Sequence, residues 1–273
     1  NSTFTGDFST NFGGKAKGNV GPILPAARSS IAGNVYYDKN NNGLFEGTDQ
    51  GIEGATVRLT GVDVFGNNID RTTFTLADGS YYFGGLQAGT YQLTETQPAG
   101  YLDGKDTIGT PGGSTSNDQF STIILPANFD GVQNNFGEIK ESSIAGFVYW
   151  DKDNDGLFEN TDAPIEGALV TLKGTDDLGN NVNLSMNTLA DGSYKFTGLR
   201  PGDYVLVETQ PAGYLDGKDT IGTPGGTTGN DTFTSISLPV DFNGVNNNFG
   251  EIKESSIAGF VYWDKDNDGL FEN

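Results

Sequence analysis

The sequence predicts an all-β protein built from tandem β-sandwich domains joined end to end. The first indication is compositional. Of the 273 residues 41 are Gly, and short alternating apolar runs are separated by Gly, Asp and Asn, as is typical of strands and turns. The second is a repeat: Asn134–Asn160 is identical to Asn247–Asn273, a period of 113 residues (247 − 134 = 113). That period is the size of a whole sandwich domain, so each copy should have its own core.

The repeat divides the chain into four parts. Residues 1–29 lack it and are predicted to hold the end of a preceding domain followed by a linker. Residues 30–142 form the first repeat, residues 143–255 the second, and residues 256–273 open a third that is incomplete. The junctions are short, so neighbouring repeats should have little freedom to swing.

Alternating apolar residues predict seven strands in each repeat, arranged antiparallel in two sheets. Tyr204, Leu206 and Glu208, for example, share one face of a strand. The strands predicted in the second repeat cover residues 144–150, 168–173, 182–187, 193–197, 203–209, 232–238 and 245–252. Those predicted in the first cover residues 31–37, 55–60, 69–75, 80–84, 90–96, 119–125 and 132–139.

The formal net charge of −21 and the absence of His and Cys argue against several classes of function. An acidic chain is a poor partner for nucleic acid or an anionic membrane surface, and no apolar run is long enough for membrane insertion. Without His and Cys, the usual general base, thiol nucleophiles and zinc–thiolate sites are missing. We therefore expect a protein that is not an enzyme and that collects cations.

One acidic stretch has the ligand order of an EF-hand calcium loop. In Asp151–Asp162, oxygen-bearing side chains stand at places one, three, five, nine and twelve. Gly156 at place six allows the sharp turn, and Leu157 at place seven offers its carbonyl. The stretch departs from the usual order at place twelve, where Asp162 replaces Glu, and a predicted strand rather than a helix precedes it. A solvated acidic turn is the alternative to a calcium site.

The same order recurs in two more copies, which strengthens the calcium interpretation. The first copy has Asn40 and Asn42 where the second has Asp, so we expect the first to bind calcium more weakly. The third copy stops before place twelve. The predicted ligands are Asp38, Asn40, Asn42, the Leu44 carbonyl, Glu46 and Asp49; Asp151, Asp153, Asp155, the Leu157 carbonyl, Glu159 and Asp162; and Asp264, Asp266, Asp268, the Leu270 carbonyl and Glu272.

A further acidic group lies in a Gly-rich stretch of each repeat. It could hold another calcium ion through carboxylate and carbonyl oxygens, or it could be a set of polar turns. Its members are Asp103, Asp106 and Asp118 in the first repeat and Asp216, Asp219 and Asp231 in the second.

Four motifs in the second repeat together resemble a known family. They are Ser-Ile-Ala-Gly-Phe-Val-Tyr-Trp-Asp-Lys-Asp-Asn-Asp-Gly (143–156), Ile-Glu-Gly-Ala-Leu-Val-Thr-Leu (165–172), Asp-Gly-Ser-Tyr-Lys-Phe-Thr-Gly-Leu-Arg-Pro-Gly-Asp-Tyr (191–204) and Glu-Thr-Gln-Pro-Ala-Gly-Tyr (208–214). Their order and spacing resemble the B-repeats of bacterial serine-aspartate-repeat surface adhesins, within the Cna-B-like family of immunoglobulin-like β-sandwiches. The resemblance implies tandem stalk domains on the cell surface or secreted, with calcium in the Asp-rich loop.

Some Cna-B-like domains form an internal Lys–Asn bond assisted by a buried Glu. Glu95 and Glu208 match that Glu by position, but Val148, Tyr149 and Trp150 stand where the family has its Lys. The bond is therefore not expected here. The alternative role for Glu208 is to accept hydrogen bonds from backbone amides or to pair locally at a sheet edge.

We expect a structural module of an extracellular or cell-surface stalk or fibre, stiffened by calcium. Its partners would be calcium ions and neighbouring repeats, in the same chain or in identical chains. The alternative is an adhesin module that binds a protein or glycan ligand through a loop or a sheet edge. The near identity of the repeats favours a spacer, since ligand sites tend to differ between copies.

Residues 256–273 are expected to belong to a longer fibre rather than to donate a strand to a neighbouring chain. An isolated strand cannot satisfy its backbone groups. Ile257, Val261 and Trp263 should therefore be buried by material outside the two complete repeats.

Overall fold

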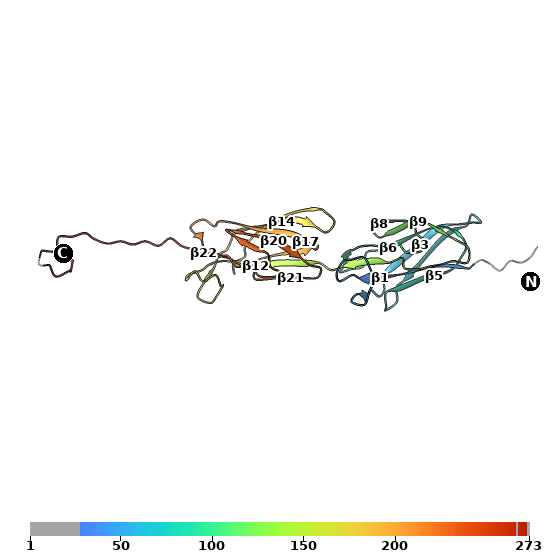
Figure 1. Ribbon diagram of the computed structural model, residues 1–273, viewed down its shortest axis with the longest axis horizontal. Coiled ribbons are helices and arrows are strands. Elements are labelled where there is room, and N and C mark those ends of the chain that lie inside the picture. The colour runs from blue at the N-terminus through green and yellow to red at the C-terminus, as the bar shows by residue number, and fades with distance from the viewer. Residues whose placement is uncertain (1–27, 266, 272–273) are drawn as a thin grey trace, which may run out of the picture. The chain divides into compact units, whose positions relative to one another are not determined.

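The computed structural model describes residues 28–265 and 267–271, so the predictions for residues 1–27 lie outside the part described. The chain separates into two units between Lys140 and Glu141, close to the predicted boundary after residue 142. Every named element in the described residues is a strand (Figure 1). Nothing described is a helix with the length and apolar character needed to cross a membrane.

One sheet of the second unit is organised around β12, which follows directly on the junction. The strand pairs antiparallel with β16 and β13 and parallel with β21 and β22, and β22 also pairs with β18. The bounds are β12 (Ser142–Trp150), β13 (Ala163–Pro164), β16 (Ser193–Leu199), β18 (Leu215–Asp216), β21 (Asn243–Gly244) and β22 (Phe249–Ile252).

The other sheet of the second unit is antiparallel throughout, in the order β15-β14-β17-β20-β19. Its strands are β14 (Leu169–Asp176), β15 (Asn181–Asn187), β17 (Gly202–Thr209), β19 (Thr227–Gly229) and β20 (Thr232–Leu238). In β14, β17 and β20 buried side chains are separated by more exposed ones, which sets the buried face of the sheet, whereas β15 and β19 have no buried residue.

The first unit repeats both sheets. One has the order β10-β1-β11-β7, and β2 and β5 join it by pairing with β1. The other has the order β4-β3-β6-β9-β8. Its strands are β1 (Ser29–Tyr37), β2 (Gln50–Gly51), β3 (Thr56–Asp63), β4 (Asn68–Phe74), β5 (Ser80–Leu86), β6 (Gly89–Thr96), β7 (Leu102–Asp103), β8 (Ser114–Ser116), β9 (Gln119–Leu125), β10 (Asp130–Gly131) and β11 (Phe136–Ile139).

The predicted all-β fold is confirmed, and the structure changes two of its details. Of the last predicted strand, residues 245–252, only β22 at Phe249–Ile252 forms; residues 245–248 are not a strand and separate β22 from the short β21, which ends at Gly244. Both β21 and β22 pair parallel to β12, so the sheet is mixed rather than antiparallel. Hydrophobic alternation reports which face of a strand is buried but carries no information about the direction of its neighbour.

The core of each unit lies between its two sheets. In the second unit Phe233 of β20 stacks on Phe249 of β22 with ring centroids 4.4 Å apart, and both are fully buried. Phe120 and Phe136 make the same contact in the first unit, also at 4.4 Å. Since truncating a buried Phe to Ala costs about 3–5 kcal/mol, this pair is a major link between the sheets.

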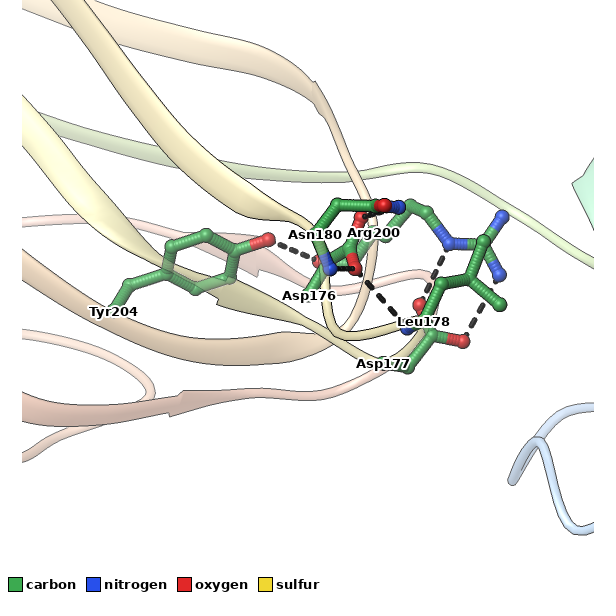
Figure 2. Close-up of polar contacts among 6 residues, drawn as sticks. All are labelled: Asp176, Asp177, Leu178, Asn180, Arg200 and Tyr204. Carbon is green, nitrogen blue, oxygen red and sulfur yellow. Dashed lines mark hydrogen bonds and ion pairs between the residues drawn. The ribbon is translucent and has the colours of Figure 1, made fainter.

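A polar turn closes the hairpin between β14 and β15 (Figure 2). Asp176 Oδ1 accepts the backbone N–H groups of Leu178 at 3.0 Å and Asn180 at 2.8 Å, which fixes the turn. Arg200 donates two hydrogen bonds to Asp177, at 2.6 and 2.9 Å. The first unit keeps the turn, with Asp63 bonded to Phe65 and Asn67, but has Val64 and Gln87 in place of the ion pair.

The described part of the third copy differs from the same residues of the second repeat. Residues 256–263 are identical to 143–150, yet no strand is assigned between residue 253 and residue 265. Ile257, Val261 and Trp263 are exposed within this chain, and their burial by material outside the two complete repeats stays a prediction. In the second repeat the same residues form β12, whose backbone groups are paired with those of β16 and β22.

Candidate metal centres

The loop of the second repeat begins where β12 ends and is organised around Asp151. This carboxylate is buried, at 1% exposure. Its Oδ2 accepts the N–H of Gly156 at 2.7 Å and its Oδ1 that of Asp155 at 3.3 Å. At the end of the loop, Asp162 accepts the N–H groups of Lys152 at 3.2 Å and Glu159 at 2.9 Å. The first and last predicted ligands thus fold the loop back on itself.

Three of the predicted ligands come together in this loop. Asp151, Asp153 and Asp162 each have a carboxylate oxygen within 4.8 Å of the others, close enough to hold one ion. Asp155 and Glu159 are exposed and are not part of that group. The Leu157 side chain is 54% exposed, which is compatible with a residue that would contribute only its carbonyl.

The first loop has the same frame. Asp38 is fully buried and accepts the N–H of Gly43 at 2.7 Å, while Asp49 accepts those of Lys39 at 3.2 Å and Glu46 at 3.0 Å. In the third copy, Asp264 accepts the N–H of Gly269 at 2.7 Å and that of Asp268 at 3.2 Å. The beginning of the loop therefore forms from local bonds alone. The predicted ligands Asp266 and Glu272 lie outside the described residues.

Two contacts that sequence reasoning missed hold each loop against its sandwich. Phe158 packs on Tyr149 of β12, with ring centroids 4.9 Å apart, and Phe45 packs on Tyr36 at the same distance. Thr220 Oγ1 donates to the carbonyl of Gly156 at 2.6 Å, as Thr107 does to Gly43 at 2.6 Å. These bonds come from the segment that also carries the second acidic group.

The structure assembles that second acidic group in both repeats. Carboxylate oxygens of Asp103, Asp106 and Asp118 lie within 4.8 Å of one another, and so do those of the three equivalent residues Asp216, Asp219 and Asp231. Asp106 is fixed from both sides, since its Oδ2 accepts the N–H of Asp118 at 3.0 Å and its Oδ1 that of Gly137 at 3.2 Å.

Two glutamates, which the sequence did not lead us to include, extend this group. Glu95 on β6 and Glu138 on β11 form a further set with Asp118, again within 4.8 Å, and Glu208, Glu251 and Asp231 match it. Asp118 thus belongs to both sets, and five carboxylates gather at one place. The signal for Glu208 was present in the alternation, because it follows Tyr204 and Leu206 on the inward face. The sequence signal for Glu251 was weaker, because it is only a charged residue within a short apolar strand.

These glutamates are buried without the partners that a buried charge needs. Glu95 is 3% exposed and Glu138 is fully buried. Within the described chain, neither carboxylate oxygen of Glu95 has a hydrogen-bond partner, and neither has Oε1 of Glu138. Gln97 donates to the other oxygen of Glu138. The same atoms of Glu208 and Glu251 are unpaired in the second repeat. Leaving a buried, ionised carboxylate oxygen without a hydrogen-bond partner costs on the order of several kcal/mol of folding free energy.

The interpretation of Glu208 as a local partner at a sheet edge was therefore wrong. Its backbone N–H donates to Asp231 O at 2.9 Å, but its side chain faces other acids instead of amides.

Burial and mutual repulsion raise the pKa of these carboxyl groups. Loss of hydration, followed by the charge of Glu251, raises the pKa of Glu208 to about 9. Loss of hydration likewise raises the pKa of Glu251 to about 8 and that of Asp219 to about 7. In the first repeat the pKa values of Glu95, Asp106 and Glu138 move in the same direction for the same reason. Near neutral pH the group must hold protons or a cation.

Sequence comparison identifies the repeats. The model of the SdrD B-like domain matches residues 29–136 and again residues 142–248. The chain belongs to the SdrD B-like domain family. The resemblance inferred from the sequence motifs is thereby confirmed, as is the expected cell-surface or extracellular location.

Relatives of these SdrD B-like domains occur in much longer proteins. Serine-aspartate repeat-containing protein D of Staphylococcus aureus (strain Newman) is 32% identical over 202 residues, which are 74% of this chain and 15% of that protein. Serine-aspartate repeat-containing protein C of the same strain is 32% identical over 180 residues, 66% of this chain and 18% of that protein. The chain thus spans less than a fifth of these relatives.

Among solved structures, these domains are similar to the Streptococcal ancillary pilin, with a TM-score of 0.35 and 16% identity over 83% of this chain and 63% of that chain. Shaft pilin SpaA from Lactobacillus rhamnosus GG has a TM-score of 0.29 and 14% identity over 85% of this chain and 100% of that chain.

Proposed function

We propose that each repeat is a calcium-binding structural module of an extracellular or cell-surface stalk or fibre, and that calcium stiffens it. The observation that supports this most strongly is the buried acidic group. Glu208, Glu251 and Asp231 bring carboxylate oxygens within 4.8 Å of one another, and oxygens of all three lack partners in the described chain. A cation among them would satisfy these oxygens and cancel their repulsion.

The chemistry of the donors favours calcium. All candidate ligands are oxygens, which hard cations prefer, and the chain has neither His nor Cys for a transition metal. Calcium accepts six to eight oxygen ligands in flexible arrangements, whereas magnesium demands a nearly ideal octahedron. Asp216, Asp219 and Asp231 would hold one ion, and Glu208, Asp231 and Glu251 another that shares Asp231. The loop would hold a further ion through Asp151, Asp153 and Asp162.

The sites would stiffen the repeat because they join segments that are distant in sequence. Glu208 comes from β17, Glu251 from β22 and Asp231 from the turn before β20, so one ion would tie the two sheets together. The loop ion would fix the end of β12. The ions would have a structural role. They would replace the repulsion between carboxylates by attraction of each carboxylate to the ion, and so oppose local opening of the sandwich.

The loop site can be tested with the double variant Asp151→Ala/Asp155→Ala in the full chain. Calcium binding at the loop should vanish, and the calcium-dependent rise in the melting temperature of the second repeat should shrink, measured by calorimetry against added calcium. Asp176→Ala is a matched control, since that acid holds a turn remote from the candidate ligands. An undiminished rise in the double variant would place the stabilising metal outside this loop.

Stiffening can be tested by small-angle scattering of the full chain. In calcium the mean end-to-end length should be greater than in chelator, because the loop carboxylates repel one another until an ion compensates them. Salt should be kept near 0.15 M in both samples so that general screening of the −21 charge is constant. Identical scattering profiles in calcium and in chelator would show that calcium does not stiffen the chain, even if the ion binds.

A further inference from the structure

The first repeat has an apolar surface at the end of the sandwich where β3 turns into β4. Its members are apolar side chains that are each at least 45% exposed: Val62, Val64, Phe65 and Ile124. Strand pairing places Val62 and Ile124 on either side of Thr90 on the outer face, about 10 Å apart over two strand spacings. Val64 and Phe65 follow in the turn directly after β3. The four therefore gather in one place, which we call the entry surface, instead of being scattered singly.

The second repeat is largely polar at the same end. The counterparts of the four residues, 113 positions later, are Thr175, Asp177, Leu178 and Ser237. Asp177 accepts two hydrogen bonds from Arg200 (Figure 2). Asp203 stands where the first repeat has Thr90, and its strand pairs in the same register. Since the strands and the turn are the same in both repeats, the sandwich itself does not require an apolar surface here.

The entry surface lies where the chain enters the first sandwich. Ser29, the first residue of β1, donates from Oγ to the carbonyl of Pro126 at 2.7 Å. Pro126 follows β9 and is two residues from Ile124, about 7 Å along the chain. The start of β1 also pairs with the end of β5, and Ala88, just beyond that end, accepts the N–H of Val64 at 2.8 Å. Residues that precede Ser29 are therefore tethered beside this surface.

The segment before the first repeat is longer and more apolar than the later junctions. Residues 14–28 stand between an Asn-Phe-Gly motif and the Ser-Ser-Ile-Ala-Gly motif that opens the repeat, whereas only residues 138–141 and 251–254 stand between the same motifs later. The longer segment contains the run Val-Gly-Pro-Ile-Leu-Pro at residues 20–25. An apolar segment thus precedes the one complete repeat that carries the apolar surface.

We propose that residues 20–25, which we call the docking segment, pack on the entry surface through Ile23 and Leu24. The docking segment lies outside the described residues. Docking would fix the direction in which the chain enters the first repeat, a task that the later junctions are expected to achieve by being short. The contact needs no cation, so it goes beyond the proposed calcium function and does not depend on it.

Reach and charge favour this segment over a separate molecule as the occupant. Leu24 is five residues before Ser29, and an extended chain of that length spans up to about 18 Å, more than the width of the surface. The tether also keeps the segment at an effective concentration in the millimolar range, so a modest apolar contact suffices. Its flanking charges are all basic, in a chain with a formal net charge of −21: Lys15, Lys17 and Arg28.

NMR of the full chain with labelled Ile, Leu and Val methyl groups tests the contact directly. Cross-relaxation should connect the methyl groups of Ile23 and Leu24 with those of Val62 and Ile124. The docking segment has no aromatic residue of its own, so an upfield shift of its methyl signals would report the ring of Phe65. Both observations should be the same in calcium and in chelator. A wild-type spectrum without these cross-peaks would overturn the proposal while leaving the calcium function untouched.

A variant that copies the second repeat supplies the comparison. It carries Val62→Thr, Val64→Asp, Gln87→Arg and Ile124→Ser, so that the entry surface takes the residues that the second sandwich already accommodates. The upfield shifts of the Ile23 and Leu24 methyl signals should be lost. Phe74→Asn is the matched control, since it also exchanges an exposed apolar residue for that of the second repeat. Phe74 pairs with Thr56, about 20 Å along β3 from the entry surface, so the shifts should persist.

Three further outcomes would overturn the proposal. Upfield shifts that survive in the variant would place the docking segment elsewhere. Shifts lost equally in the Phe74→Asn control would show that the entry surface is not the site. Contacts that disappear on dilution, with a sedimentation coefficient that rises with concentration, would assign the surface to a second copy of the chain. The wild-type cross-peaks decide the matter even if the variant fails to fold, which unchanged signals of the buried Val57 and Leu59 would exclude.

Discussion

Replacing Glu208 and Glu251 together by glutamine is expected to stabilise the second repeat in chelator, raising its melting temperature by roughly 5–10 °C. The substitutions keep the size of both side chains but remove two buried charges whose pKa values burial raises to about 9 and about 8. At pH 8 these groups are partly ionised against their neighbours, and each unit of pKa shift corresponds to about 1.4 kcal/mol. The buried amides lose part of this gain because they too need partners.

In calcium the order should reverse. Wild-type protein gains about 2.7 kcal/mol for each site when calcium is at 100 times its dissociation constant, roughly 10 °C or more for a domain of this size. The double variant lacks two ligands of the site formed by Glu208, Asp231 and Glu251 and should lose the gain from that site. Scanning calorimetry of the full chain, with and without chelator, measures both effects. Glu166→Gln/Glu254→Gln, at exposed positions, is the control for charge alone. A double variant that is less stable than wild type in chelator would show that these glutamates are not mutually repulsive.

Without calcium, the stability of the protein should fall as the pH rises from about 5 to about 9. The carboxyl groups of Glu208, Glu251 and Asp219 have pKa values of about 9, 8 and 7 in the folded chain, above their usual values near 4. Over this window the folded state therefore binds more protons than the unfolded state. Under that condition the free energy of unfolding decreases as the pH increases. A loss of about 2 kcal/mol or more, roughly 10 °C in melting temperature, is expected across the window.

Calcium should abolish this slope, because bound cation keeps the carboxylates ionised without repulsion. The measurement is the melting temperature at intervals from pH 5 to pH 9, in calcium-free buffer and in calcium. Glu208→Gln/Glu251→Gln should flatten the calcium-free profile of the second repeat and leave that of the first, which separates this group from the general charge of the chain. A calcium-free profile that is flat or rises with pH would contradict the burial of ionisable, mutually repelling acids.

Much of the fold could be predicted because its signals are local. The alternation in residues such as Tyr204, Leu206 and Glu208 reports which face of a strand is buried, and the 113-residue repeat showed that each copy is a domain. The loop was equally accessible, since Asp151, Gly156 and Asp162 are bonded within the same twelve places. Even in the third copy, Asp264 makes its bonds to Asp268 and Gly269 without a sandwich behind it.

The sequence by itself thus determined the class of fold, the 113-residue repeat and the order of groups in each loop, all of which depend on patterns along the chain. Only the tertiary structure decided that β12 and β22 run parallel and that Glu208 and Glu251 join Asp231 in one buried group. These residues lie in different strands and in the turn before a third, and are brought together only when two sheets pack.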